Sequence, residues 1–217
     1  MGTPKTQRRI RRSRDEARQL ILAAAEQILR ESGPEAVNVR AVATRVGLTD
    51  AAVNHHFGTR DELLETLLRH AGRRLKDALD AAAEQWKETG ASVRQLVDIM
   101  ADLYADGSYG ELALRLHLSG WRDRGSGMLG TVVTVLHERR SQACVAAGRG
   151  APSMAETQFV VGLLHQTVAL DPLFGAPFRF SAGARRSDEP ALEQKKKAWT
   201  AMFEAALAGE PALAGGE

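Results

Sequence analysis

The chain has 217 residues, of which 44% are hydrophobic and 26% are charged, so it can bury a substantial core. Its net charge is only +2, and no uninterrupted apolar run approaches the roughly 18 residues of a membrane span. The basic N-terminus lacks the apolar core of a signal peptide. We therefore expect a cytoplasmic protein with no membrane association. The single cysteine, Cys144, excludes an intrachain disulfide and is expected to be a buried small apolar residue.

Positive charge gathers at the start of the chain. Residues 1–60 hold eleven Lys and Arg against six Asp and Glu, a net of +5, whereas the remainder carries −3. The stretch KTQRRIRRSR places six positive charges between Lys5 and Arg14. Such a run suits an arm that neutralises DNA phosphates or enters a minor groove, and it equally suits a solvated tail. We expect residues 1–13 to be a flexible basic arm and residues 209–217 a disordered tail.

Helical patterns cover nearly the whole chain, which predicts an all-α fold. β-branched and aromatic residues do not alternate with polar ones over the length of a strand, while Ala, Leu, Glu, Gln and Arg dominate the long segments. The first helix is expected to begin after Ser13, where Glu16 completes a capping-box sequence. The residues Ser-Gly-Pro at 32–34 are expected to follow its end.

Two short helices are predicted next. One follows Asn38 as its N-terminal cap and stops at Gly47, a natural left-handed terminator, and the other lies between Thr49 and Gly58. Two helices joined by so short a turn form a helix-turn-helix, in which the later helix is presented to the major groove of DNA.

The stretch GLTDAAVNHHFGTRDELL contains the later of these helices. Before the second glycine its only large apolar residues beyond the turn are Val53 and Phe57, one helical turn apart, and these are expected to anchor the helix. The side chains expected to point outward or to the flank are Ala51, Ala52, Asn54 and His55. Small side chains allow close approach to DNA, while Asn54 and His55 can donate to base edges or phosphates.

A long fourth helix is expected to begin at the capping-box sequence of Thr59 and Glu62 and to run to about Trp86. The adjacent histidines of the preceding helix do not predict a metal site. Neighbouring side chains on a helix point about 100° apart, so His55 and His56 cannot chelate one ion together. A plain helical hairpin within a core is the alternative interpretation of the helix-turn-helix segment.

The stretch VNVRAVATRVGLTDAAVNHHFGTRDELL resembles the signature of the tetracycline-repressor (TetR) family of bacterial transcription regulators, over roughly residues 14–70. In that signature the recognition helix ends in an aromatic residue, and a helix with a basic, acidic and Leu-rich start follows. The resemblance implies phosphate contacts from Asn38, Arg40 and Arg60. It also implies contacts to DNA from Thr49, Ala51, Ala52, Asn54 and His55. The chain departs from the family pattern at Asn54, where Tyr is common, and at Asp50, where a basic residue is frequent.

Five further helices are predicted at about 92–105, 111–122, 128–147, 154–170 and 190–208. The family resemblance implies that residues 61–208 bind a small effector among the middle helices and form a homodimer through Met154–Leu170 and Pro190–Ala208. Six residues are candidates for effector contacts, although ordinary bundle core explains the same pattern. They are Trp86, Met100, Tyr104, His117, Trp121 and Phe159.

Residues 171–190 do not fit a short connection between helices. The segment contains three Phe, three Pro and two Gly, and it is long for a helix-helix connection. Its apolar first half is expected to pack over a pocket or across a dimer, whereas its polar second half, from Ser181, suggests disorder.

These features together predict a two-domain, dimeric, sequence-specific DNA-binding regulator, a repressor released from a palindromic operator by a small-molecule effector. The expected DNA-binding domain covers residues 14–60. Two alternatives are an all-helical enzyme that carries a helix-turn-helix by coincidence and a nonspecific architectural DNA-binding protein. We expect no catalytic residues, no cofactor and no metal site, because the sequence lacks a phosphate-binding loop, a metal-spaced His/Glu set and a nucleophile motif.

Overall fold

The computed structural model describes residues 13–122, 125 and 127–208. Within these residues it contains helices and no β-strand, which confirms the predicted all-α class. The chain divides into two compact units, one ending at Leu67 and the other beginning at Leu68, so this boundary falls later than the one expected after residue 60. Apart from Ser13, the expected basic arm lies outside the described residues, as does the expected tail at 209–217.

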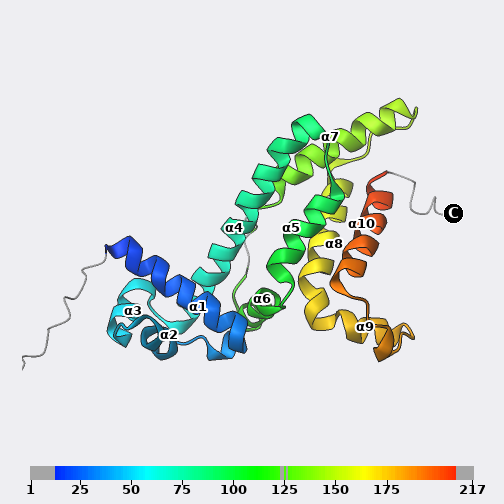
Figure 1. Cartoon of the computed structure of the whole chain (residues 1–217). Helices are drawn as coiled ribbons and strands as arrows, with labels where there is room; N and C mark the ends of the chain where they lie inside the picture. The colour runs from blue at the N-terminus through cyan, green and yellow to red at the C-terminus, as the bar shows by residue number, and fades with distance from the viewer. Residues whose placement is uncertain (1–12, 123–124, 126, 209–217) are drawn as a thin grey trace, which may run out of the picture. The chain divides into compact units, whose positions relative to one another are not determined.

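Four helices contribute to the first unit (Figure 1). They are α1 (Arg14–Ala36), α2 (Val39–Val46), α3 (Asp50–Phe57) and the start of α4 (Arg60–Thr89). Helix α2 packs against both α1 and α3. The bounds of α2 and α3 agree with those predicted, whereas α1 extends past Ser32 to Ala36 and α4 continues to Thr89 rather than ending near Trp86.

Local sequence explains where α1 and α2 begin and end. The Ser13 hydroxyl accepts from the backbone N–H of Glu16, and the Glu16 carboxylate accepts from the backbone N–H of Ser13 at 2.7 Å, which confirms the capping box. Gly33, with φ of 75°, interrupts α1 near its predicted end, so Pro34–Ala36 form a separate turn. Gly47 ends α2 in the left-handed conformation at φ 68°.

The core of the first unit is drawn from all four helices and from Val37, which lies between α1 and α2. Burying these apolar side chains together provides the main driving force for folding this small unit, since none of its short helices is stable alone. The completely buried residues are Ile21, Ala25, Leu29, Val37, Val42, Val53, Leu63, Leu64 and Leu67.

The second unit contains α5 (Val93–Tyr104), α6 (Ser108–Leu118), α7 (Gly130–Ala146), α8 (Met154–Leu170) and α10 (Leu192–Ala208). Each corresponds to a predicted helix, although α6 lies about three residues earlier in the chain than expected. Helices α5, α8 and α10 pack against one another, and α7 packs on α8 and α10 (Figure 1).

Close packing in this unit uses small residues as well as large ones. A Cβ atom on Gly110 of α6 would lie 2.6 Å from the backbone oxygen of Ala169, so glycine permits α6 to approach α8 closely. Cys144 of α7 is buried, as predicted.

The apolar face expected between two copies of the chain is only partly exposed. Phe159 and Leu163 of α8 and Met202 of α10 are exposed. Other large apolar residues of these two helices are buried within the protomer, because α8 and α10 also supply the core shared with α5 and α7. They include Leu164, Val168, Trp199, Phe203 and Leu207.

The segment from Asp171 differs from the irregular connection that the sequence suggested. Helix α8 passes directly into a π-helix, η1 (Asp171–Gly175), and then into α9 (Ala176–Ser181). A 3-10 turn, η2 (Arg186–Asp188), lies between α9 and α10. The two prolines at 172 and 177 sit in the first turns of η1 and α9, where proline is tolerated because it supplies no N–H. No residue of η1 or α9 is fully buried.

The helical run Met154–Ser181 has the length and the mean hydropathy, 1.3, of a membrane span, although the sequence contains no uninterrupted apolar stretch of that length. About 28% of its most apolar window is buried within the protein. Length and composition alone do not distinguish a lipid-facing helix from one that packs against protein on two sides.

Candidate DNA-binding site

Helices α2 and α3 form the helix-turn-helix that the sequence predicted. The turn at residues 47–49 joins them, and each helix has its expected N-terminal cap. The side-chain oxygen of Asn38 accepts from the backbone N–H of Ala41 at 2.9 Å, and the hydroxyl of Thr49 accepts from that of Ala52 at 3.2 Å. Gly58 closes α3, where its N–H donates to the Asn54 carbonyl at 2.7 Å.

Helix α3 has one face in the core and one in solvent. Val53 and Phe57 are buried, as predicted for the anchoring pair. Ala51, Asn54 and His55 are exposed on the other side, and Ala52 is half-buried. The helix thus presents the polar side chains of Asn54 and His55 beside two alanines. This surface has no bulky apolar side chain that would prevent close approach of a DNA duplex.

Arg18 of α1, which the sequence analysis did not single out, fixes the end of α3. Its guanidinium donates to the His56 carbonyl at 2.9 Å and lies 4.4 Å from the centre of the Phe57 ring. The His56 carbonyl is one of the last four of α3, which have no hydrogen-bond donor within the helix. The positive charge of Arg18 also interacts favourably with the negative end of the helix dipole. Burial of His56 lowers its pKa, and the nearby positive charges of His55, Arg14 and Arg18 lower it further.

Two residues expected to contact phosphates are engaged in holding the domain together. Arg60 donates to the carbonyl oxygens of Val37 at 2.8 Å and Pro34 at 2.7 Å, so its guanidinium ties the start of α4 to the end of α1. Asn38 caps α2 and donates to the Ala36 carbonyl at 3.1 Å. The cap formed by Asn38 was predicted from the local sequence, whereas the contacts of Arg60 join residues far apart in the chain and were not.

Arg40 remains a good candidate for a phosphate contact. It lies on the first turn of α2 and is exposed. Thr49 is also exposed at the start of α3, where its hydroxyl keeps donor capacity beyond the cap. Asp50 is exposed next to Thr49, and its negative charge would repel a phosphate group at that point. The same carboxylate stabilises α3, because it lies in the first turn of the helix, at the positive end of the dipole. Among the described residues, the exposed candidates for contact with DNA therefore centre on Arg40, Thr49 and the outer side of α3.

The six candidate effector residues differ in how far they are buried. Met100 is completely buried in the core, and Trp86 is buried with its indole N–H donating to Gln95 at 2.7 Å. His117 and Phe159 are exposed and Trp121 is half-buried. A contact between an effector and these residues stays a prediction.

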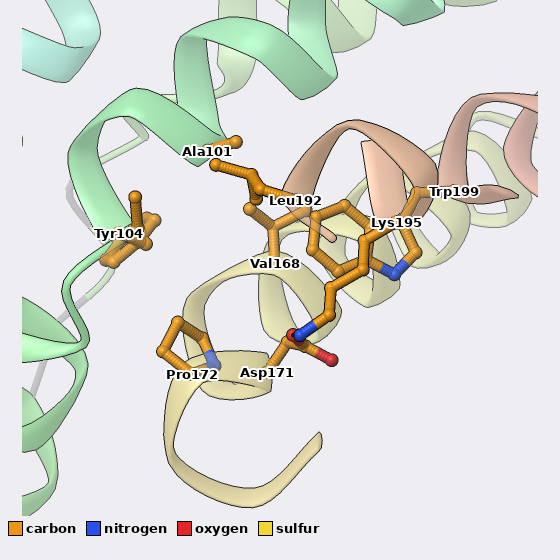
Figure 2. Close-up of a pocket in the computed structure, with 9 residues that line it drawn as sticks. Ala101, Tyr104, Val168, Asp171, Pro172, Leu192, Lys195 and Trp199 are labelled. Carbon is orange, nitrogen blue, oxygen red and sulfur yellow. Dashed lines mark hydrogen bonds and ion pairs between the residues drawn. The ribbon is translucent and has the colours of Figure 1, made fainter. Parts of the chain in front are cut away.

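Tyr104 does line a pocket, which lies between α5, the junction of α8 with η1, and α10 (Figure 2). The pocket measures about 120 Å³. Its wall is mainly apolar, with one acidic and one basic residue from facing elements: Ala101, Tyr104, Ala105, Val168, Asp171, Pro172, Leu192, Lys195 and Trp199. The Tyr104 hydroxyl lies 2.8 Å from Nε2 of His165, and burial raises the pKa of Tyr104 to about 12.

A short, anchored and exposed second helix that follows a tight turn is the geometry of a helix-turn-helix motif. Residues 21–67 match the family described as bacterial regulatory proteins, tetR family, and these residues contain most of the first unit. Over these residues the chain is similar to that family.

Known proteins resemble different parts of the chain. The HTH-type transcriptional repressor Rv3405c of Mycobacterium tuberculosis is 37% identical over 81 residues, which are 37% of this chain and 43% of the repressor. The HTH-type transcriptional regulator BetI of Stenotrophomonas maltophilia is 30% identical over 105 residues, 48% of this chain and 52% of BetI. The chain thus spans about half the length of the curated relatives it matches.

One solved structure resembles nearly the whole fold. It is the fatty acid degradation regulator FadR from Bacillus halodurans, with a TM-score of 0.51 and 18% sequence identity. The match covers 88% of this chain and 98% of that one. At this identity the likeness concerns the all-helical fold, including the second unit.

Proposed function

We propose that the protein is a cytoplasmic, sequence-specific transcriptional repressor that binds a two-fold symmetric operator as a homodimer. The exposed row of Ala51, Asn54 and His55 on an anchored α3 carries this proposal, because it offers base-edge contacts where close approach is possible. The match of residues 21–67 to the tetR family of bacterial regulatory proteins and the likeness to a protein named as a transcriptional repressor support it. Neither alternative, an enzyme or an architectural DNA-binding protein, has a comparable observation in its favour.

The different roles proposed for phosphate contacts and base contacts can be tested directly. Arg40→Ala is expected to weaken binding to every duplex alike and to reduce the slope of log K against log salt by about one. Asn54→Ala and His55→Ala are expected to cost about 1–3 kcal/mol on the preferred operator and much less on other DNA. The measurement is fluorescence anisotropy with an operator selected from random DNA and with a scrambled duplex, at several salt concentrations.

Lys87→Ala in the second unit is the matched control, since it also removes one exposed positive charge. Arg60→Ala is unsuitable for this purpose, because it breaks hydrogen bonds to two backbone carbonyls inside the domain. Equal affinity of the unmodified protein for selected and scrambled DNA at moderate salt would refute sequence-specific recognition.

We further propose that a small effector in the second unit weakens DNA binding. The pocket beside Tyr104 supports this idea, and its size limits the ligand. A cavity of ~150 Å³ holds benzene, whereas sites for larger ligands measure roughly 300–1,000 Å³. The mainly apolar wall, with the Tyr104 hydroxyl and the Asp171–Lys195 pair at hand, favours an uncharged single-ring aromatic molecule with one polar group. Helix α4 contributes residues to both units without a break, which offers a route for coupling.

The expected result is reciprocal coupling. A bound effector that lowers operator affinity tenfold corresponds to about 1.4 kcal/mol, and operator must weaken binding of that effector by the same factor. Calorimetric titration of phenol and related single-ring alcohols, with and without operator, measures both. Ala105→Leu, at the pocket wall, should abolish binding of the molecule without altering operator affinity in its absence. Identical effector affinity with and without operator would exclude coupling for that molecule.

A further inference from the structure

Asp50 is an acidic residue on the helix that the proposed function presents to DNA. It lies in the first turn of α3, directly after the cap residue Thr49, and it is exposed. Within the described part of the chain, its side chain makes no ion pair or hydrogen bond. Glu62, in the first turn of the next helix, differs, because its carboxylate accepts from the backbone N–H of Thr59 at 2.7 Å. The Asp50 carboxylate is therefore available to an outside partner.

Asp50 lies on the flank of α3 that also carries Asn54. The two residues are one helical turn apart, so at about 100° per residue they point within about 40° of each other. Both are exposed, whereas Val53 and Phe57 are buried. In a helix-turn-helix, the N-terminal residues of the second helix contact base edges in the major groove. Asp50 is thus at the end of α3 that enters the groove.

The neighbours of Asp50 leave it room to approach the bases. Ala51 is exposed and Ala52 is half-buried, and neither side chain extends beyond a methyl group. An aspartate side chain is short, so its carboxylate reaches a base edge only where the backbone comes close to the DNA. The two small residues that follow Asp50 permit this close approach.

The partner of this carboxylate on DNA is a base and not a phosphate group. A carboxylate and a phosphate are both negatively charged, so contact between them is repulsive. For the same reason, Asp50 opposes binding to any duplex in which it meets no hydrogen-bond donor. A residue of this kind raises the affinity for DNA only through a base edge, and it lowers the affinity for other sequences.

The chemistry of the major groove limits which base this is. An ionised carboxylate only accepts hydrogen bonds, and the donors in the groove are the N4 amino group of cytosine and the N6 amino group of adenine. The adenine amino group lies between two acceptors, N7 of the same base and O4 of the paired thymine. The cytosine amino group has an acceptor on one side only, O6 of the paired guanine, because a C–H group lies on the other side. A carboxylate is therefore repelled less at cytosine.

We propose that the Asp50 carboxylate accepts a hydrogen bond from the N4 amino group of a cytosine, at one position in each half of the operator. This inference deepens the proposed function, because it rests on the sequence-specific binding proposed there. Repulsion between Asp50 and phosphate also weakens binding to DNA that lacks this cytosine. Asp50 thus increases the ratio of specific to nonspecific affinity by both effects.

Selection of operators from random DNA tests the assignment with the full chain. The unmodified protein is expected to select cytosine at one position in each half-site. Asp50→Asn is expected to select adenine there instead, because a side-chain amide pairs with both N6 and N7 of adenine. The other positions of the operator should stay the same. Asp61→Asn also removes an exposed carboxylate from the first turn of a helix, and this matched control should select the same operator as the unmodified protein.

Modified DNA tests the hydrogen bond itself. Each cytosine that selection identifies is replaced in turn, in both half-sites, by pyrimidin-2-one, which has a hydrogen atom in place of the amino group. At the cytosine that Asp50 contacts, the replacement should weaken binding of the unmodified protein by about five- to tenfold per half-site. Asp50→Ala has no acceptor at this position, so the same replacement should weaken its binding far less.

Affinity for a scrambled duplex measures the repulsion. Asp50→Asn should bind such a duplex about two- to fivefold more tightly than the unmodified protein at low salt, because one negative charge near the phosphates is removed. The difference should shrink as the salt concentration rises. An affinity that is unchanged or weaker would contradict the position of Asp50 at the DNA surface.

The results separate this inference from the proposed function. A cytosine amino group that matters to the unmodified protein and not to Asp50→Ala supports the contact. Equal losses in both proteins at every cytosine, an operator without a fixed cytosine, or the same operator selected by Asp50→Asn would overturn the contact and leave sequence-specific binding intact. If the unmodified protein selects no common sequence, the proposed function fails and this inference fails with it.

Discussion

Replacing Phe57 by alanine is expected to unfold the first unit and to abolish operator binding. Phe57 is one of two buried anchors of α3, and its ring also lies beneath the guanidinium of Arg18. Removing a buried phenylalanine typically costs about 3–5 kcal/mol, because the transfer free energy of the ring is lost and a cavity remains. Whole domains are stable by only about 5–15 kcal/mol, so a small unit cannot absorb this loss readily.

Hydrogen exchange resolved along the chain measures this effect directly. Protection of the amides in α1 to α3 should fall by about two to four orders of magnitude in Phe57→Ala, since 1.4 kcal/mol corresponds to a factor of ten in the opening equilibrium. Protection in α5, α8 and α10 should be unchanged. His55→Ala, on the exposed face of the same helix, is the control and should leave protection intact. Native protection together with native operator affinity in Phe57→Ala would show that α3 is held by other contacts.

The helix bounds of the first unit could be predicted because their signals are local. Ser13 and Glu16 are three residues apart and form the reciprocal hydrogen bonds of a capping box. Gly47 adopts a positive φ, which a residue with a Cβ atom adopts only at a steric cost. The anchoring of α3 followed from the same kind of reasoning, since Val53 and Phe57 are one turn apart in a helix with no other large apolar residue. Such features need no knowledge of distant parts of the chain.

The roles of Arg60 and Arg18 could not be predicted in this way. Arg60 reaches carbonyls 23 and 26 residues earlier in the chain, and Arg18 reaches one 38 residues later. From the sequence alone, a basic residue at the start of a helix is equally consistent with a contact to phosphate and with hydrogen bonds that stabilise the domain. The three-dimensional structure shows that Arg60 stabilises the domain, while its contact with phosphate stays a prediction.

The segment after Asp171 shows a second limit of sequence reasoning. Pro172, Gly175 and Pro177 predict a break in helical structure, yet the chain continues as a π-helix and an α-helix. The ion pairs that stabilise this arrangement join Asp171 to Arg179 and to Lys195, eight and twenty-four residues along the chain. For α8 and α10 the difficulty is different. Both have apolar residues on more than one side, so periodicity did not reveal which side faces the core.

Separating the two copies is expected to cost more operator affinity than any single change at the DNA surface. Phe159→Glu combined with Met202→Glu places two charges on exposed apolar positions of α8 and α10, outside the protomer core. The variant should be monomeric at micromolar concentration. Joining two binding modules raises affinity by about 10²–10⁴-fold without any new contact, because the second contact becomes intramolecular. A monomer loses that advantage even though each α3 is unchanged.

The affinity for an isolated half-site distinguishes this mechanism from damage to the fold. The monomeric variant should bind a half-site duplex as tightly as one half of the unmodified dimer does, while its affinity for the full operator falls by about two to four orders of magnitude. Leu118→Glu combined with Val145→Glu adds the same charge at exposed positions elsewhere and should leave both affinities intact. A monomeric variant that still bound the full operator at native strength would mean that one copy reads the whole site, and the two-fold symmetry of the operator would then have no physical basis in the protein.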